Sequence, residues 1–189
     1  MGKSGFIGGN QGNRADYDFY PTPPYAVLEL LSREIFEGSV WECACGNGAI
    51  SEVLKSKGFN VYSSDITDRG YGEQRNLDFL DDNLTKNIRA DNIITNPPFK
   101  SAQKFIEKAL TIATKKVVIL QRLAFLESKE RYKLFTTTPL KCIYVFSKRL
   151  NFYPNGINDK KKSGMLAFAW FVWEQGYNKK PYINWIKGD

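Results

Sequence analysis

The spacing of apolar residues along the chain predicts alternating strands and helices. Short apolar runs bounded by Gly, Pro or Asn are typical of buried strands, and apolar positions three and four residues apart are typical of one helix face. We expect strands beginning near residue 40 and spanning 60–64, 93–94, 117–120, 141–146 and 165–173, with residues 76–80 in a further strand or the loop at its end. We expect helices at about 23–35, 49–57, 101–110 and 123–135.

The first of these helices has clear sequence signals at its start. Val27, Leu30 and Ile35 fall on one helical face, which we expect to be buried. Thr22 suits the N-cap and Pro23 the first helical position, where the missing N–H costs nothing. These signals predict that the segment from Tyr20 is held in place directly before the helix.

A glycine turn follows the strand that begins at residue 40. The order is strand, Gly46-Asn47-Gly48, helix, second strand and then Asp65, which is the order of a nucleotide-binding βαβ unit with an acid for the ribose hydroxyls. The third glycine of the dinucleotide fingerprint and the Gly-Lys-Ser/Thr phosphate loop are both missing, which disfavours NAD and ATP. A glycine turn alone can equally be a structural turn without a ligand. Glu42 before it and Asp65 after it favour the interpretation that this turn binds a ligand.

The stretch Asn96-Pro97-Pro98-Phe99 ends the apolar strand at residues 93–94. Each proline fixes its own φ and disfavours the helical region for the residue before it, so this loop is stiff. Such a loop presents an amide, a carbonyl oxygen and a ring at the carboxyl end of a strand, where open α/β sheets bind ligands. In isolation the stretch could be a simple turn, since Asn-Pro pairs mark turns. In this context it predicts a surface for a flat group that carries an amine.

Composition and charge narrow the function classes. The chain has 189 residues and 42% hydrophobic residues, which suits one globular domain. It has three cysteines and no histidine, so it lacks both a disulfide pattern and the ligands of an ordinary zinc site, and we expect no metal. The absence of histidine also excludes Ser-His and Cys-His nucleophile pairs. A net charge of +7 favours a nucleic-acid partner, although a merely basic surface is an alternative.

The organisation of the chain suggests one domain with two flanking segments. Residues 1–16 are expected to be a flexible N-terminal arm, residues 17–175 the domain, and residues 176–189 a C-terminal tail that packs on the domain by its rings. No apolar run is long enough for a membrane span and no signal-peptide pattern is seen, which predicts a cytoplasmic protein, in the host cytoplasm if it is encoded by a phage. The long loop after residue 146 mixes cations with rings, which suits phosphate contact and base stacking, although a solvated loop with two buried rings is an equal alternative.

Together the proline motif and the glycine loop resemble class I S-adenosylmethionine-dependent methyltransferases. More narrowly, the chain resembles DNA adenine methyltransferases of the amino-group type, in particular small bacteriophage forms, over about residues 17–174. The family motif is Asn, Asp or Ser, then Pro-Pro, then Tyr, Phe or Trp, and residues 96–99 match it in full. The resemblance implies a single Rossmann-like α/β domain, with helices on both faces of a mostly parallel seven-stranded sheet that includes an antiparallel C-terminal strand.

The resemblance also implies roles for individual residues. The catalytic motif is Asn96, Pro97, Pro98 and Phe99, in which the Asn96 side-chain oxygen and the Pro97 carbonyl accept the two N–H bonds of the target amine and Phe99 stacks on the base. The cofactor S-adenosyl-L-methionine is then expected at Tyr20, Pro21, Thr22, Glu42, Cys43, Ala44, Gly46, Gly48, Asp65, Ile66, Asp78, Phe79 and Asn96, with Glu42 where the family usually has Asp. The substrate is expected at Phe99, Lys148, Arg149, Phe152, Tyr153, Lys160, Lys161 and Lys162.

These matches predict transfer of a methyl group to N6 of adenine, with DNA favoured over RNA. The chain has no room for a separate target-recognition domain, so the sequence predicts no target site, and it predicts no oligomeric state. Three alternatives stay open: an RNA adenine methyltransferase, a methyltransferase of protein glutamine side chains that uses Asn-Pro-Pro-Tyr, and a non-catalytic nucleic-acid-binding subunit with the same fold.

Overall fold

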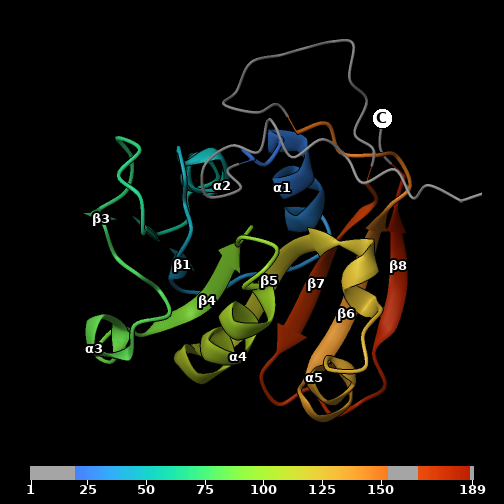
Figure 1. Ribbon diagram of the computed structural model, residues 1–189. Helices are drawn as coiled ribbons and strands as arrows, with labels where there is room; N and C mark the ends of the chain where they lie inside the picture. Colours follow the sequence, from blue (N-terminus) through green and yellow to red (C-terminus); the bar gives the residue numbers. More distant parts are fainter. Residues whose placement is uncertain (1–19, 153–165, 188–189) are drawn as a thin grey trace, which may run out of the picture.

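The computed structural model describes residues 20–152 and 166–187, which form a central sheet with helices on both faces (Figure 1). The described strands lie in the order β3-β2-β1-β4-β5-β7-β6-β8. Their bounds are β1 Val40–Glu42, β2 Val61–Asp65, β3 Gln74–Arg75, β4 Ala90–Thr95, β5 Ala113–Arg122, β6 Leu140–Phe146, β7 Phe168–Glu174 and β8 Tyr182–Ile186. The described part of the chain therefore has eight strands, one more than the seven we expected.

Strand β7 is antiparallel to its two neighbours, β5 and β6, and all other pairs in the sheet are parallel. This agrees with the predicted antiparallel C-terminal strand. The chain passes from β1 outward through β2 and β3, then returns to the other side of β1 with β4. The direction of strand order thus reverses between β1 and β4, and ligands of open α/β sheets bind beside such a reversal.

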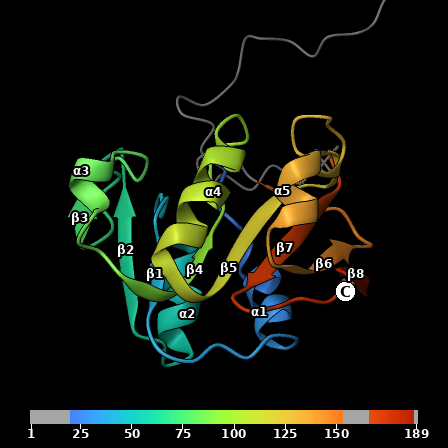
Figure 2. The ribbon, with the colours of Figure 1, turned by 90° about the horizontal axis from the view of Figure 1, so that it is seen from below.

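The helices cover the sheet in two layers. Figure 2 shows α1 (Pro24–Leu31) and α2 (Ala49–Ser56) on one face, and α3 (Asp82–Thr85), α4 (Ala102–Ile112) and α5 (Tyr132–Thr137) on the other. Successive strand residues point to opposite faces, so one strand contributes to both cores. In β5, Val117 packs with the α4 and α5 core, whereas Val118 packs with the α1 and α2 core. This two-sided burial explains why the central strands are continuous apolar runs.

Residues 76–80 form the loop after β3, one of the two expected forms, and its Leu77 and Phe79 are buried. The other predicted elements are present with two differences. The predicted helix at 123–135 is instead a short 3-10 helix η3 (Leu123–Leu126) followed by α5. Helix α1 begins one residue later than expected, with Pro23 at the N-cap, and ends at Leu31. Ile35 therefore lies beyond the helix and is 80% exposed, contrary to the prediction that it belongs to the buried face.

A buried ionic cluster joins the end of α1 to the amino ends of β5 and β6, at the side of the sheet away from the reversal point. Glu34 accepts hydrogen bonds from Lys116 (2.5 Å), Lys141 (3.1 Å) and the Tyr144 hydroxyl (2.8 Å), and Lys141 also contacts Glu174 at 2.8 Å. Burial by itself raises the pKa of Glu34, but these hydrogen bonds outweigh it and the pKa lies below its usual value. Glu34 is therefore ionised near neutral pH and stabilises the end of α1.

The described part of the C-terminal tail forms the edge strand β8, parallel to β6. Ile186 is buried, but Tyr182 and Trp185 are 43% and 62% exposed. Backbone pairing, Ile186 and the Tyr182 side chain, which interacts with Tyr144 and Cys142 of β6, make the contact with the domain. The predicted packing through rings therefore applies to Tyr182, whereas Trp185 is largely exposed. The predicted N-terminal arm, residues 1–16, lies outside the described residues.

Candidate functional site

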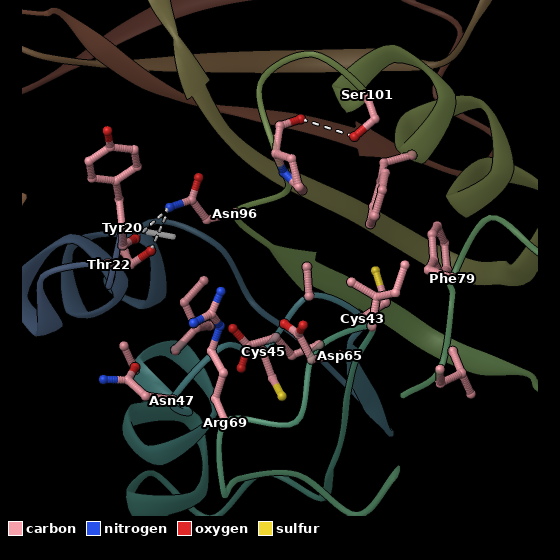
Figure 3. A pocket seen from close by; sticks show the side chains of 18 of the residues that line it. Tyr20, Thr22, Cys43, Cys45, Asn47, Asp65, Arg69, Phe79, Asn96 and Ser101 are labelled. Atoms are coloured by element: carbon pink, nitrogen blue, oxygen red, sulfur yellow. Dashed lines mark hydrogen bonds between the residues drawn. The ribbon is translucent and has the colours of Figure 1, made fainter. Parts of the chain in front are cut away.

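A cavity of about 550 Å³ opens at the carboxyl ends of β1, β2 and β4, beside the point where the strand order reverses (Figure 3). Its volume lies within the range of clefts that hold small ligands, about 300–1,000 Å³. Twelve of the residues predicted for catalysis or cofactor binding line it, namely Tyr20, Pro21, Thr22, Glu42, Cys43, Ala44, Asp65, Ile66, Asp78, Phe79, Asn96 and Pro98. Segments far apart in the sequence are thus brought to one site, as the parallel sheet requires.

The glycine turn forms one wall and is held by the acid at the end of β2. The Asp65 carboxylate accepts the Gly46 N–H (2.8 Å) through one oxygen and the Thr67 N–H (2.8 Å) through the other. Gly48 adopts a φ of 84°, and a Cβ atom there would lie 2.5 Å from the ring of Tyr71. Both conformation and space therefore require glycine at position 48. Gly46 and Gly48 shape the wall without lining the cavity themselves.

Glu42, at the end of β1, is buried beneath this turn and connected to α2. One of its carboxylate oxygens accepts the Ser51 N–H at 2.8 Å and also the Ser51 hydroxyl. Ser51 lies in the first turn of α2, where the helix dipole favours a negative charge. Burial nevertheless dominates and raises the pKa of Glu42 to about 8. Glu42 is thus a carboxyl group on the cavity wall that can gain or lose a proton near neutral pH.

Asn96 lies where β4 ends, and its side chain is held by the segment before α1. The amide nitrogen donates to the Tyr20 carbonyl (3.3 Å) and to the Thr22 hydroxyl (3.1 Å). A backbone carbonyl can only accept, so the donor end of the amide must face Tyr20. Figure 3 shows the amide oxygen of Asn96 pointing away from both partners. The oxygen is thereby left to accept a hydrogen bond from a ligand.

This contact corrects the predicted role of Thr22 as the helix N-cap. Its hydroxyl lies near the Asn96 amide, and no side-chain cap is made at the start of α1.

The rest of the proline loop is held by the start of α4. Pro97 is buried, and the carbonyl of Pro98 accepts hydrogen bonds from both the N–H (3.1 Å) and the hydroxyl (3.3 Å) of Ser101. The loop is thus fixed at both ends, to Tyr20 and Thr22 on one side and to α4 on the other.

An aromatic cluster lies next to the proline loop. The ring of Phe99 is nearly parallel to that of Tyr20, with an interplanar angle of 18° and 6.2 Å between centroids, and the guanidinium of Arg122 lies 3.9 Å from the Phe99 centroid. Phe152 packs against Phe168 at 4.6 Å and meets Tyr20 edge-on. The two rings expected to contact a base, Phe99 and Phe152, are therefore in one cluster, and the ring parallel to Phe99 is Tyr20.

The loop after β3 closes another side of the cavity. Asp78 lines the cavity, and one of its carboxylate oxygens accepts the Leu80 N–H at 2.8 Å. Phe79 also lines the cavity but is only 1% exposed, because Trp41 and Phe105 pack against its ring at 5.2 and 4.9 Å. Phe79 thus offers a small apolar edge rather than an open stacking face, and its predicted contact with a ligand ring stays a prediction.

The remaining predicted substrate residues lie apart from the cavity. Lys148 and Arg149 follow β6 and are exposed at the same edge of the sheet. Tyr153, Lys160, Lys161 and Lys162 lie outside the described residues, so their roles stay predictions.

The cavity also has lining residues that the sequence reasoning missed, including Arg69, Lys100 and Phe105. Lys100 directly follows the proline motif and Phe105 lies in the first turn of α4, so their nearness to the motif was an available signal. Arg69 lies in the loop after β2, where sequence patterns give little information. Cys45 was also missed, and burial raises its pKa to about 12, so the thiol is protonated and unreactive near neutral pH.

The described residues contain neither a metal-binding cluster nor a membrane-spanning helix. No group of three or more His, Cys, Asp or Glu side chains with the arrangement of a metal site is found among residues 20–152 and 166–187. Within the same ranges, no helix has the length and apolar character needed to cross a membrane.

Comparisons with known proteins agree with this architecture. A candidate RNA methyltransferase of Pyrococcus horikoshii superposes with a TM-score of 0.63 at 17% identity, covering 89% of this chain and 93% of that protein. The chain has a Rossmann-like methyltransferase fold. The M protein of the type I restriction enzyme EcoKI also superposes, with a TM-score of 0.56 and 14% identity over 82% of this chain and 44% of the larger protein.

Comparison of sequences alone also finds one distant relative. Ribosomal RNA small subunit methyltransferase A of Borrelia garinii is 24% identical over 210 aligned positions, which cover 86% of this chain and 74% of the relative. No protein-family model matches the chain. The methyltransferase fold is therefore established, whereas activity and substrate have to be argued from the site.

Proposed function

We propose that this protein is an S-adenosylmethionine-dependent methyltransferase that modifies the exocyclic N6 amine of adenine in a nucleic acid. The observation that carries the proposal is the orientation of the Asn96 amide. Its nitrogen is occupied by Tyr20 and Thr22, and its oxygen is available at the wall of the cavity (Figure 3). That is the arrangement needed to accept an N–H bond from an amine next to a bound methyl donor.

The cavity fits S-adenosyl-L-methionine in both size and chemistry. Asp65 lies where the acid of a βαβ unit binds ribose hydroxyls, and both of its oxygens keep further acceptor capacity. Glu42 lies deeper in the cavity and would ionise beside the ammonium of the methionine end, because an opposite charge favours the charged form. Asp78 can accept from the adenine amine, and Ile66 and Phe79 supply apolar walls. When bound, this cofactor supplies an electrophilic methyl group.

The chain's contribution to the chemistry is to hold and orient the amine. The lone pair of an aromatic amine is delocalised into its ring, which makes the nitrogen a poor nucleophile. Acceptors that bind both N–H bonds draw the nitrogen toward tetrahedral geometry and localise the lone pair. The Asn96 oxygen is one acceptor and the Pro97 carbonyl the other. Because the proline loop is fixed at both ends, the acceptors are positioned in advance, an effect that can lower a barrier by several kcal/mol.

Phe99 would bind one face of the target base. The guanidinium of Arg122 lies over this ring and the Tyr20 ring lies nearly parallel to it at 6.2 Å, so a base that stacks on Phe99 would take the place of one of these two groups. A base inside a duplex cannot reach this loop without being flipped out, at a cost of a few kcal/mol. The site therefore favours an unpaired adenine.

The predicted preference for DNA over RNA is not supported by the comparisons. The Borrelia relative and the Pyrococcus protein are named for RNA, whereas the restriction-enzyme M protein belongs to a class that acts on DNA. We therefore propose RNA as the first substrate and DNA as the second. Methylation of protein glutamine is less favoured, because the basic residues Lys148 and Arg149 lie exposed at the same sheet edge as the site.

The direct test combines cofactor titration with methyl transfer. The protein is incubated with labelled S-adenosylmethionine and single-stranded RNA, single-stranded DNA, duplexes or protein, and the products are analysed by nucleoside mass spectrometry. We expect N6-methyladenine from an unpaired substrate, and loss of transfer with retained cofactor binding in Asn96→Ala. Cofactor binding without transfer to any nucleic acid would refute the proposed activity. Absence of cofactor binding would favour the non-catalytic nucleic-acid-binding subunit.

A further inference from the structure

The outer edge of the sheet carries an exposed tryptophan that the proposed chemistry does not use. Trp185 is 62% exposed on β8, and its neighbour on the same face of the strand, Ile183, is 50% exposed. Trp185 is in register with Val145 of β6, which packs against the α4 and α5 core. The indole therefore lies on that face of the sheet, at the border where the described helices no longer cover it.

Basic residues lie next to this tryptophan at the carboxyl end of β8. Strands β6 and β8 run in parallel and end side by side, and the Ser147 N–H donates to the Ile186 carbonyl at 2.9 Å. The exposed side chains of Lys148 and Arg149 follow β6, and Lys187 follows β8. Two segments that are about 40 positions apart in the chain thus place three cations beside one exposed ring.

This edge of the sheet is continuous with the candidate active site. β4, β6 and β8 point in the same direction, so Asn96 and the basic residues lie at the same ends of their strands (Figure 1). Four steps between neighbouring strands separate β4 from β8. At about 4.8 Å a step this is about 19 Å, which corresponds to roughly six stacked nucleotides at about 3.4 Å each.

We propose that Trp185, Lys187, Lys148 and Arg149 form a binding surface for the single strand that flanks the target adenine. The cations bind phosphates, and an unpaired base roughly six nucleotides from the target stacks on the indole, the combination by which proteins bind single strands without reading sequence. This inference rests on the proposed function for the position of the target base. It adds to that function a second region of contact with the nucleic acid, about 19 Å from the candidate active site.

The charges around β8 argue against a second copy of the chain as the occupant. Exposed edge strands can pair with other chains, but lysines and proline on the edge oppose such pairing. Lys179, Lys180 and Pro181 precede β8 and Lys187 follows it, so two copies would bring like charges together. The phosphates of a nucleic acid would instead be attracted by each of these cations, which strengthens binding.

The test uses oligonucleotides of twelve nucleotides with one target adenine at either the 5′ or the 3′ end, and a trinucleotide centred on adenine. Fluorescence anisotropy measures binding and single-turnover assays measure transfer. We expect Trp185→Ala to weaken binding about tenfold for one polarity of the long substrate and to leave the trinucleotide unchanged. Trp185→Phe, which keeps a ring, should restore most of the binding.

One control variant and two patterns of results separate this proposal from the proposed function. Tyr132→Ala removes a ring of comparable exposure (71%) from α5, outside the proposed surface, and should change neither measurement. If the wild-type protein binds oligonucleotides with the expected dependence on Trp185 but transfers no methyl group, the surface is supported and the proposed function fails. If transfer occurs and Trp185→Ala matches wild type with both long substrates, the surface is refuted and the proposed function stands.

Discussion

Replacing Thr22 by valine tests whether the orientation of the Asn96 amide matters for catalysis. Thr22 is buried, and valine has nearly the same shape, so the change removes the hydroxyl that accepts from the Asn96 nitrogen at 3.1 Å and little else. The other acceptor, the Tyr20 carbonyl at 3.3 Å, is retained. The amide nitrogen thus keeps a partner, and the full cost of an unsatisfied donor is avoided.

The size of the effect follows from the energy of one hydrogen bond. A neutral hydrogen bond contributes about 0.5–1.5 kcal/mol net, which corresponds to about a twofold to tenfold change in kcat if the bond holds the Asn96 oxygen where the transition state needs it. A rotated amide would present its NH₂ group to the target amine, donor against donor, and would be inactive. We therefore expect kcat of Thr22→Val to fall about fivefold, with Thr22→Ser close to wild type because serine keeps the hydroxyl.

Single-turnover transfer and calorimetry of cofactor binding together provide the assay. Thr22 also lines the cavity, so a modest change in the cofactor Kd is expected, but smaller than the change in rate. The reasoning would be refuted by a Thr22→Val protein with wild-type kcat, or by one in which weaker cofactor binding accounts for the whole loss.

Three further predictions concern stability and pH. Burial raises the pKa of Glu42 in the folded protein to about 8, from an ordinary value of 4.5, so the folded state holds the proton more tightly. The free energy of unfolding should therefore fall as pH rises from about 5 to 8, by at most about 5 kcal/mol. Glu42→Gln should lack this decline when the Tm values of both cofactor-free proteins are compared at pH 5 and 8.5. Gly48→Ala should lower the free energy of unfolding by more than the roughly 1–2 kcal/mol that a left-handed backbone costs a residue with a Cβ, because that Cβ would contact Tyr71. Gly58 has a similar φ of 85° with no neighbour within 4 Å, so Gly58→Ala should show only the conformational cost. Urea denaturation of both variants measures the difference. Glu34→Gln should lower the free energy of unfolding by about 1.5–3 kcal/mol, because it removes charged hydrogen bonds from two half-buried lysines that then keep only Glu174. A Tm within 1 °C of wild type would contradict this interpretation of the cluster.

The sequence predicted the order of elements and twelve of the residues that line the cavity because these depend on local patterns. Apolar runs such as residues 117–120 are continuous only in strands buried on both faces, and glycine or proline turns mark where the strands end. Since the carboxyl ends of parallel strands meet at one edge, Glu42, Asp65 and Asn96 had to come together once the strands were identified.

Features that depend on contacts distant in sequence were not predictable in the same way. The hydroxyl of Thr22 could cap α1 or contact Asn96, which is 74 positions away, and the local sequence favours the cap. The strand β8 is only five residues long and follows a polar stretch that contains Pro181, so its sequence alone does not distinguish it from a loop, and its pairing with β6 decides the outcome. Arg122 lies beyond the apolar run at 117–120 that predicted the strand, and only the packing at the end of β5 brings it over Phe99.

The helix α1 is held at both of its ends by groups with very different functions. Just before it begins, Tyr20 and Thr22 bind the Asn96 amide, and just after it ends, Glu34 binds lysines and a tyrosine of β5 and β6. Eight residues of helix span only about 12 Å, and a short helix transmits displacement as a rigid body. Under the proposed function, the position of the amine acceptor is therefore linked through α1 to ion pairs at the amino ends of β5 and β6. We expect changes to that distant cluster to alter the catalytic rate without altering any residue that touches cofactor or substrate.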